Sequence, residues 1–192
     1  MSDADLVARA RQGDAAAFGA LVDLHRSAVY RAARAALHSH EEAEDASQDA
    51  FVIAYQRLGS FRGEASFKTW LLTIAWRQAI SRRRALTRWW ARIAPANRND
   101  PDPAIGGDVA HPDPSPEAAA AGSELGRAIV HEIRALPPKL RDALLLAQSG
   151  ELSYEEIAAI TKSPVGTIKW RVSEARKKIK ARLVERGFSD VG

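Results

Sequence analysis

The sequence predicts an all-α protein made of two small helical domains. Apolar residues recur at helical spacing along most of the chain, and no segment shows sustained period-two alternation. Six of the nine prolines lie between residues 95 and 116, beside two glycines and several aspartates, which is typical of an extended linker. We therefore expect domains at 1–92 and 122–192, joined by a linker at 93–121.

The composition is globular and excludes several kinds of chemistry. The 192 residues are 46% hydrophobic and 27% charged, which suits folded domains rather than a disordered chain. There is no cysteine, so a disulfide scaffold, a thiolate zinc site and a cysteine nucleophile are excluded. We find no signal-peptide pattern and no run of about eighteen apolar residues, and we expect a cytoplasmic protein without membrane insertion.

Charge is distributed unevenly along the chain. Residues 77–92 carry six arginines and no acid, and residues 162–186 carry nine lysines or arginines against two acids. Acids gather instead near the N-terminus, at Glu41, Glu42, Glu44, Asp45 and Asp49. This polarity indicates two different macromolecular partners.

Two helices and a loop are expected in the N-terminal domain. The first helix follows an Asp14 cap and has an apolar face of Phe18, Leu21, Val22, His25 and Val29. The second spans about 41–55, with a buried stripe of Ala43, Ala46, Ala50 and Ala54. Its opposite face carries Glu41, Asp45, Gln48, Asp49 and Val52. An acidic helix face of this kind is by itself more often solvated than functional.

A loop and a further helix follow between Phe61 and Trp76. Arg62, Gly63 and the polar residues after them suit a loop. Phe67, Trp70, Leu71 and Ile74 suit the next helix, and we assign Trp70 and Leu71 to packing because an aromatic stripe at helical spacing is more often core.

The C-terminal domain is expected to contain a helix-turn-helix. One helix carries the stripe Leu125, Ile129 and Ile133, and Pro137-Pro138 begin another with Leu140, Leu144 and Ala147. Ser153 and Glu156 then form a capping box that begins a short helix through about Ile160. After a break at residues 161–164, Ser163 is expected to cap a second helix with Pro164 at its first position.

The second helix of this pair has the pattern of a DNA-reading helix. Val165, Ile168, Val172, Ala175 and Ile179 fall on one face and are expected to pack inward. The opposite face comprises Thr167, Trp170, Ser173, Glu174 and Lys177, and it is flanked by Lys169, Arg171, Arg176 and Lys178. Flanking cations can neutralise phosphates while the central side chains reach base edges. A solvated basic helix is the alternative; the capping box, the turn and the amphipathic helix together favour DNA binding.

Three blocks of sequence together resemble the extracytoplasmic-function (ECF) sigma factors of bacterial RNA polymerase. They are LVARARQGDAAAFGALVDLHRSAVYRAA, AEDASQDAFVIAYQRLGSFRGEASFKTWLLTIA and LPPKLRDALLLAQSGELSYEEIAAITKSPVGTIKWRVSEARKKIKARL. They occur in the family's order and at its spacing, and they cover nearly the whole chain apart from the linker.

The resemblance implies a transcription initiation factor that binds both RNA polymerase and promoter DNA. The N-terminal domain would bind core RNA polymerase and open the promoter at the minus-10 element, and the C-terminal domain would read the minus-35 element. Asp45, Gln48 and Asp49 match the positions that contact the clamp of the largest catalytic subunit. An anti-sigma factor is the further partner that the resemblance implies.

The resemblance also implies two sets of DNA contacts. The minus-10 candidates are Arg62, Glu64, Ser66, Lys68, Arg77, Arg82, Arg83 and Arg84. The minus-35 candidates are Thr167, Lys169, Trp170, Arg171, Ser173, Glu174, Arg176 and Lys177.

Three positions depart from the family's pattern. Arg77 stands where an asparagine is frequent, which affects the identity of the captured minus-10 base. Trp170 replaces a usually small residue, and Glu174 stands where a basic one is frequent, so minus-35 preference is expected to differ. Trp170 could contact a thymine methyl group or pack on the protein.

Other classes of function find less support. A conventional helix-turn-helix regulator, with an N-terminal domain that senses a ligand and no need for core polymerase, is the main alternative. An enzyme is not expected, because there is no phosphate-cradling glycine motif and no HExxH, and capping accounts for Glu155 and Glu156. His38 and His40 lack a supporting metal-ligand pattern, so we expect neither a metal nor another cofactor.

Overall fold

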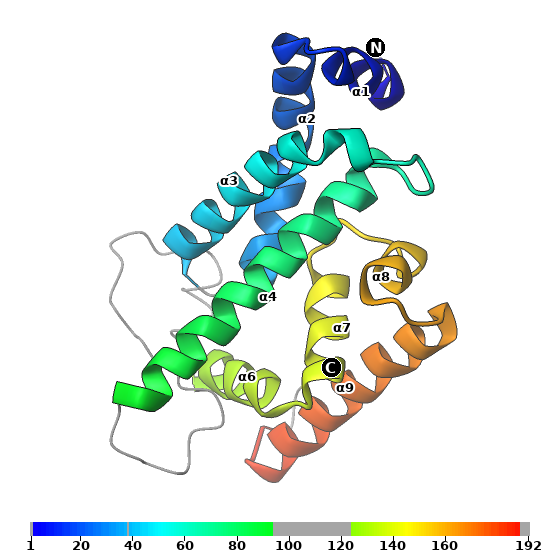
Figure 1. Cartoon of the computed structure of the whole chain (residues 1–192). Coiled ribbons are helices and arrows are strands. Elements are labelled where there is room, and N and C mark those ends of the chain that lie inside the picture. Colours follow the sequence, from blue (N-terminus) through cyan, green and yellow to red (C-terminus); the bar gives the residue numbers. More distant parts are fainter. Residues whose placement is uncertain (1, 38, 94–123, 189–192) are drawn as a thin grey trace. The chain divides into compact units, whose positions relative to one another are not determined.

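The all-α prediction is confirmed. The computed structural model describes residues 2–37, 39–93 and 124–188, and none of them lies in a β-strand (Figure 1). Most of the expected linker, 93–121, lies outside these residues. No helix in the described ranges is long and apolar enough to cross a membrane. The helices are α1 (Asp3–Arg11), α2 (Ala15–Ala36), α3 (His40–Gln56), the short 3₁₀ helix η1 (Leu58–Ser60), α4 (Phe67–Ile93), α6 (Glu124–Ala135), α7 (Pro138–Gln148), α8 (Tyr154–Thr161) and α9 (Val165–Glu185).

The chain divides into two compact units. Unit 1 comprises Met1–Ala85 and Leu145–Ser163, and unit 2 comprises Leu86–Leu144 and Pro164–Gly192. Unit 1 therefore contains α1, α2, α3, most of α4, and α8, whereas α6 and α9 belong to unit 2. The sequence-based boundaries at 92 and 122 stay a prediction.

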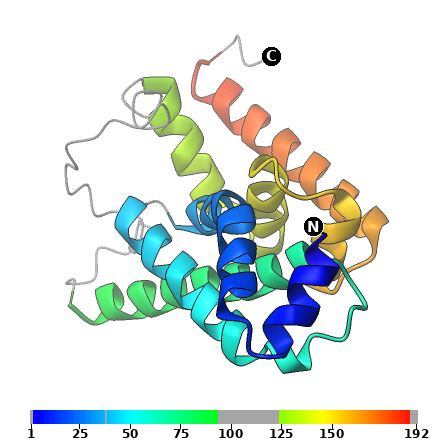
Figure 2. The ribbon, with the colours of Figure 1, turned by 90° about the horizontal axis from the view of Figure 1, so that it is seen from above.

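In unit 1, α1 and α3 pack against α2 (Figure 2). Asp14 caps α2 as predicted, since its Oδ1 accepts the N–H of Ala17 at 3.0 Å. Leu21 and Val29 are fully buried on the predicted apolar face. The predicted stripe on α3 is also confirmed, because Ala43, Ala46, Ala50 and Ala54 are all 0% exposed. Side chains this small allow the two helix backbones to approach closely.

In unit 2, α9 packs on α6. The predicted stripe of Leu125, Ile129 and Ile133 is only half-buried, whereas Ala128 and Glu132 are buried. Glu132 is buried in ion pairs: its carboxylate accepts Arg182 of α9 at 3.2 Å and Arg186 at 2.9 Å. A carboxylate can be buried when it is paired in this way. On α9, Ile168, Val172 and Ala175 are buried as predicted, and Val165 and Ile179 are half-buried.

The two predicted helix starts near residues 153 and 163 have different outcomes. The capping box of α8 is present, because Ser153 Oγ accepts the N–H of Glu156 at 3.1 Å and the Glu156 carboxylate accepts the N–H of Ser153 at 2.8 Å. The prediction that Ser163 caps the next helix is wrong. Pro164 is the N-cap of α9, and the Ser163 hydroxyl donates instead to the Thr161 carbonyl at 3.3 Å.

Candidate functional site

The outward face of α3 forms an acidic surface, defined here as Glu42, Asp45, Gln48 and Asp49. The buried alanines fix which side of α3 packs inward, so the opposite side is left to solvent. The three predicted polymerase contacts, Asp45, Gln48 and Asp49, are all exposed. Carboxylates held in this way can form charge-assisted hydrogen bonds with the arginines of a partner.

Arg82 of α4 lies on this acidic surface. Its guanidinium donates to Asp49 Oδ2 at 2.6 Å and reaches Asp45 Oδ2 and Glu42 Oε2 at 3.4 Å each. The hydrogen bond to Asp49 is the main reason that the pKa of Arg82 is raised above its usual value, although partial burial opposes the shift. A residue predicted to contact the minus-10 strand is thus paired with two of the predicted polymerase contacts.

Six of the other predicted minus-10 residues fall into three groups. Arg62 and Glu64 lie in the exposed loop before α4, with 3.9 Å between Arg62 Nη1 and Glu64 Oε1. Ser66 caps α4, since its hydroxyl accepts the N–H of Thr69 at 3.1 Å. Farther along α4, Arg77 and Arg84 are exposed, whereas Arg83 is only 7% exposed.

Aromatic rings gather where the loop enters α4. Phe61, Phe67 and Trp70 contact one another, with ring centroids 5.3 to 5.8 Å apart. Phe67 and Leu71 are buried, and Trp70 is half-buried, so the assignment to packing is confirmed for Leu71 and only partly for Trp70. A half-buried aromatic edge of this kind is a surface on which an unstacked base can rest.

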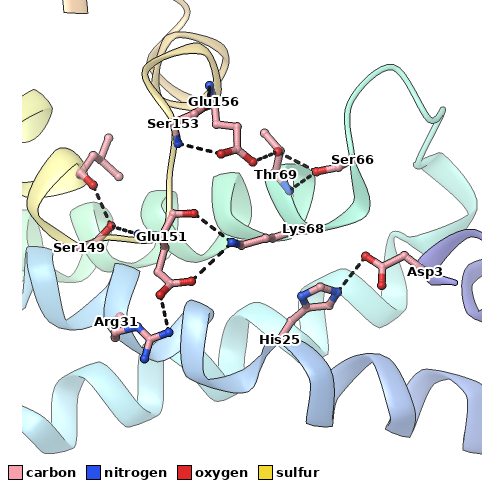
Figure 3. A network of polar contacts seen from close by, with 11 residues as sticks. Asp3, His25, Arg31, Ser66, Lys68, Thr69, Ser149, Glu151, Ser153 and Glu156 are labelled. Carbon is pink, nitrogen blue, oxygen red and sulfur yellow. Dashed lines mark hydrogen bonds and ion pairs between the residues drawn. The ribbon is translucent and has the colours of Figure 1, made fainter. Parts of the chain in front are cut away.

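Lys68, another minus-10 candidate, belongs to a polar network within unit 1 (Figure 3). Its ammonium group donates to the Glu151 carbonyl at 3.0 Å and lies 3.5 Å from the Glu151 carboxylate. Arg31 of α2 forms an ion pair with the other oxygen of that carboxylate. In the next position of α4, the Thr69 hydroxyl donates to Glu156 Oε1 at 2.8 Å. Sequence reasoning did not find Arg31, Thr69 or Glu151, and it assigned Glu156 to capping alone.

The environment of Glu156 favours its charged form. Burial is the largest single influence and would raise the pKa of Glu156, but hydrogen bonds from Ser153 and Thr69 and the charge of Lys68 together outweigh it. The pKa of Glu156 is therefore below its ordinary value of 4.5. At neutral pH, Glu156 is therefore a carboxylate that accepts hydrogen bonds from Ser153 and Thr69.

The predicted minus-35 residues form the solvent-facing side of α9. Lys169, Trp170, Ser173, Arg176 and Lys177 are exposed. Trp170 is 60% exposed, so its indole ring faces solvent and does not fill the core. Thr167, Arg171 and Glu174 are half-buried, and Glu174 lies 3.5 Å from Lys178 one turn later. That ion pair offsets the one acidic charge on this side of the helix.

Comparisons with known proteins match two separate segments of the chain. Residues 21–89 match the model of Sigma-70 region 2, and residues 126–179 match that of Sigma-70 region 4. The RNA polymerase sigma-H factor of Pseudomonas aeruginosa is 35% identical over 186 residues, covering 92% of this chain and 91% of that protein. The ECF RNA polymerase sigma-E factor of Escherichia coli is 34% identical over 182 residues, covering 93% of each chain.

The chain belongs to the ECF RNA polymerase sigma factors. A solved structure of the sigma factor RpoE in complex with the anti-sigma factor NepR, from Bartonella quintana, is similar to it. That likeness has a TM-score of 0.58 and 26% sequence identity, and it covers 86% of this chain and 96% of the other.

The candidate surfaces of this sigma factor fall within the two matched regions. The acidic surface of α3 and the N-terminal part of α4 lie in region 2, and α8 and most of α9 lie in region 4. Among the described residues, no three His, Cys, Asp or Glu side chains are grouped to hold a metal ion. His40 instead contacts the Tyr30 hydroxyl at 2.7 Å and Glu44 at 3.3 Å, and His38 lies outside the described residues.

Proposed function

We propose that this sigma factor binds core RNA polymerase through the acidic surface of α3 and directs initiation at promoters with minus-10 and minus-35 elements. The observation that carries the proposal is the outward position of Asp45, Gln48 and Asp49 over a fully buried alanine stripe. The exposed basic side of α9, within the region 4 match, supports a second contact with duplex DNA.

The remaining parts of the proposal assign a function to each segment of the chain. Residues 1–92 bind the polymerase clamp and open the minus-10 element, 93–121 connect this part to the next, and 122–192 read the minus-35 element. The protein works in the cytoplasm as a transcription initiation factor without enzymatic activity of its own. An anti-sigma factor controls it, as the Bartonella quintana complex suggests by likeness.

Run-off transcription with purified core polymerase across a promoter library tests the proposed function. We expect selective transcripts only when both the sigma factor and core polymerase are present. A conventional helix-turn-helix regulator would instead bind its operator tightly as the free protein and would give no selective initiation. That second outcome would overturn the proposal.

Replacing Arg171 or Arg176 with alanine is expected to weaken minus-35 binding. Each arginine neutralises about one phosphate, so the slope of log affinity against log salt should flatten by about 0.9 per residue. Affinity should fall by about tenfold at moderate salt, measured on a minus-35 duplex with the holoenzyme. Lys139→Ala, at an exposed position of α7, is the matched control. An unchanged slope and affinity in both variants would remove these residues from the DNA surface.

A further inference from the structure

The side chains around Glu151 form a site that binds negatively charged groups. Arg31 from α2 and Lys68 from α4 meet on the two oxygens of one carboxylate, and that carboxylate is only 13% exposed. Thr69 donates its hydroxyl to a second carboxylate, that of Glu156, beside them. Figure 3 shows the three donors and the two acids facing one another. The two carboxylates bound in this site, those of Glu151 and Glu156, belong to the chain itself.

A phosphate group would be held by the same donors. Guanidinium, ammonium and hydroxyl groups are the usual ligands of phosphate oxygens, and a phosphodiester carries a negative charge as a carboxylate does. Arg31 and Lys68 keep 53% and 33% of their side chains exposed, so a ligand from solvent can reach them once the acids withdraw.

The site and the surface on which an unstacked base can rest both belong to the beginning of α4. Lys68, Thr69 and Trp70 all lie in the first turn of α4, and the Trp70 ring contacts Phe61 and Phe67. A single strand whose base rests on Trp70 would bring its own backbone to the first turn of α4. Stacking and a nearby cationic backbone site are the two features that single-strand binding requires.

We propose that Arg31, Lys68 and Thr69 bind a backbone phosphate of the open minus-10 strand, and that Glu151 and Glu156 occupy this site in the free protein. The proposal rests on the proposed function and deepens it. It adds Arg31 to the DNA-binding residues. It also makes residues 149–156 an internal competitor that has to leave before the strand can bind.

The test measures binding of a fluorescent single-stranded minus-10 oligonucleotide to the full-length free protein by anisotropy at low salt. Glu151→Gln removes the competing charge and keeps the side-chain shape, and Glu156→Gln keeps the capping box because glutamine also serves there. Each variant should bind the strand about threefold to tenfold more tightly, the scale expected for the loss of one or two partly exposed ion pairs. Glu155→Gln is the matched control, because it makes the same charge change at an exposed residue of α8.

Two further measurements separate competition from a general effect of charge. Arg31→Gln in the Glu151→Gln background should abolish the gain in affinity. A probe with a neutral methylphosphonate backbone should bind Glu151→Gln and the wild type equally. If Glu155→Gln gives the same gain, or if neither Glu151→Gln nor Glu156→Gln binds the strand more tightly, the proposal is overturned. Run-off transcription by the wild type is scored separately, and its failure would overturn the proposed function instead.

Discussion

Replacing Asp45 and Asp49 together with lysine is expected to abolish binding to core RNA polymerase. Both carboxylates lie on the exposed side of α3, and lysine there would meet the arginines of the clamp with like charge. Coupling energies of close interfacial charge pairs run from about 1.5 to 7 kcal/mol, so two reversals should cost at least about 3 kcal/mol, or about 100-fold in affinity. A pull-down with purified core polymerase, followed by titration, measures this loss.

The experiment needs two controls because Arg82 contacts both of the substituted residues. The double variant also places two lysines beside a guanidinium that now contacts Asp45 and Asp49, so α4 could be disturbed. Asp45→Asn with Asp49→Asn removes the charges without reversing them and should still weaken binding. Asp23→Lys with Glu155→Lys makes the same total charge change at exposed positions outside the acidic surface, and it should bind normally. Retained affinity in the lysine and asparagine variants, with helical circular dichroism unchanged, would refute the docking assignment.

The parts of the fold that the sequence predicted well are those set by local physics. The Asp14 cap and the Ser153 capping box depend on groups three residues apart, and both are present. The alanine stripe of α3 depends only on helical periodicity. The acidic surface follows from the same periodicity, because one buried face defines its opposite.

The parts that could not be predicted join residues far apart in the chain. Arg82 reaches Asp49 across 33 positions, and Lys68 reaches Glu151 across 83. No spacing rule links such positions, so the sequence predicted Arg82 and Lys68 as minus-10 contacts without indicating their partners within the chain. Glu132 shows the same limit: helical periodicity assigns a charged residue to solvent, whereas its pairing with Arg182 and Arg186 places it inside.

Replacing Ala46 and Ala50 with leucine is expected to destabilise unit 1 strongly. Both alanines are 0% exposed on the side of α3 that packs inward, one helical turn apart. Each substitution inserts three carbon atoms into a filled space, and overpacking costs about 1–3 kcal/mol per site. The pair should therefore remove about 2–6 kcal/mol, a large part of the 5–15 kcal/mol that is typical of a domain.

Denaturant unfolding followed by circular dichroism measures this loss as a lower midpoint. Ala15→Leu with Ala16→Leu, at exposed positions of α2, makes the same chemical change and should stay within about 0.5 kcal/mol of the wild type. The Ala46 and Ala50 variant should also bind core polymerase less well, although no residue of the acidic surface has changed, because that surface depends on how α3 packs. Normal stability with lost binding would show instead that α3 meets the polymerase through its alanine side, and the orientation argued for Asp45 and Asp49 would be wrong.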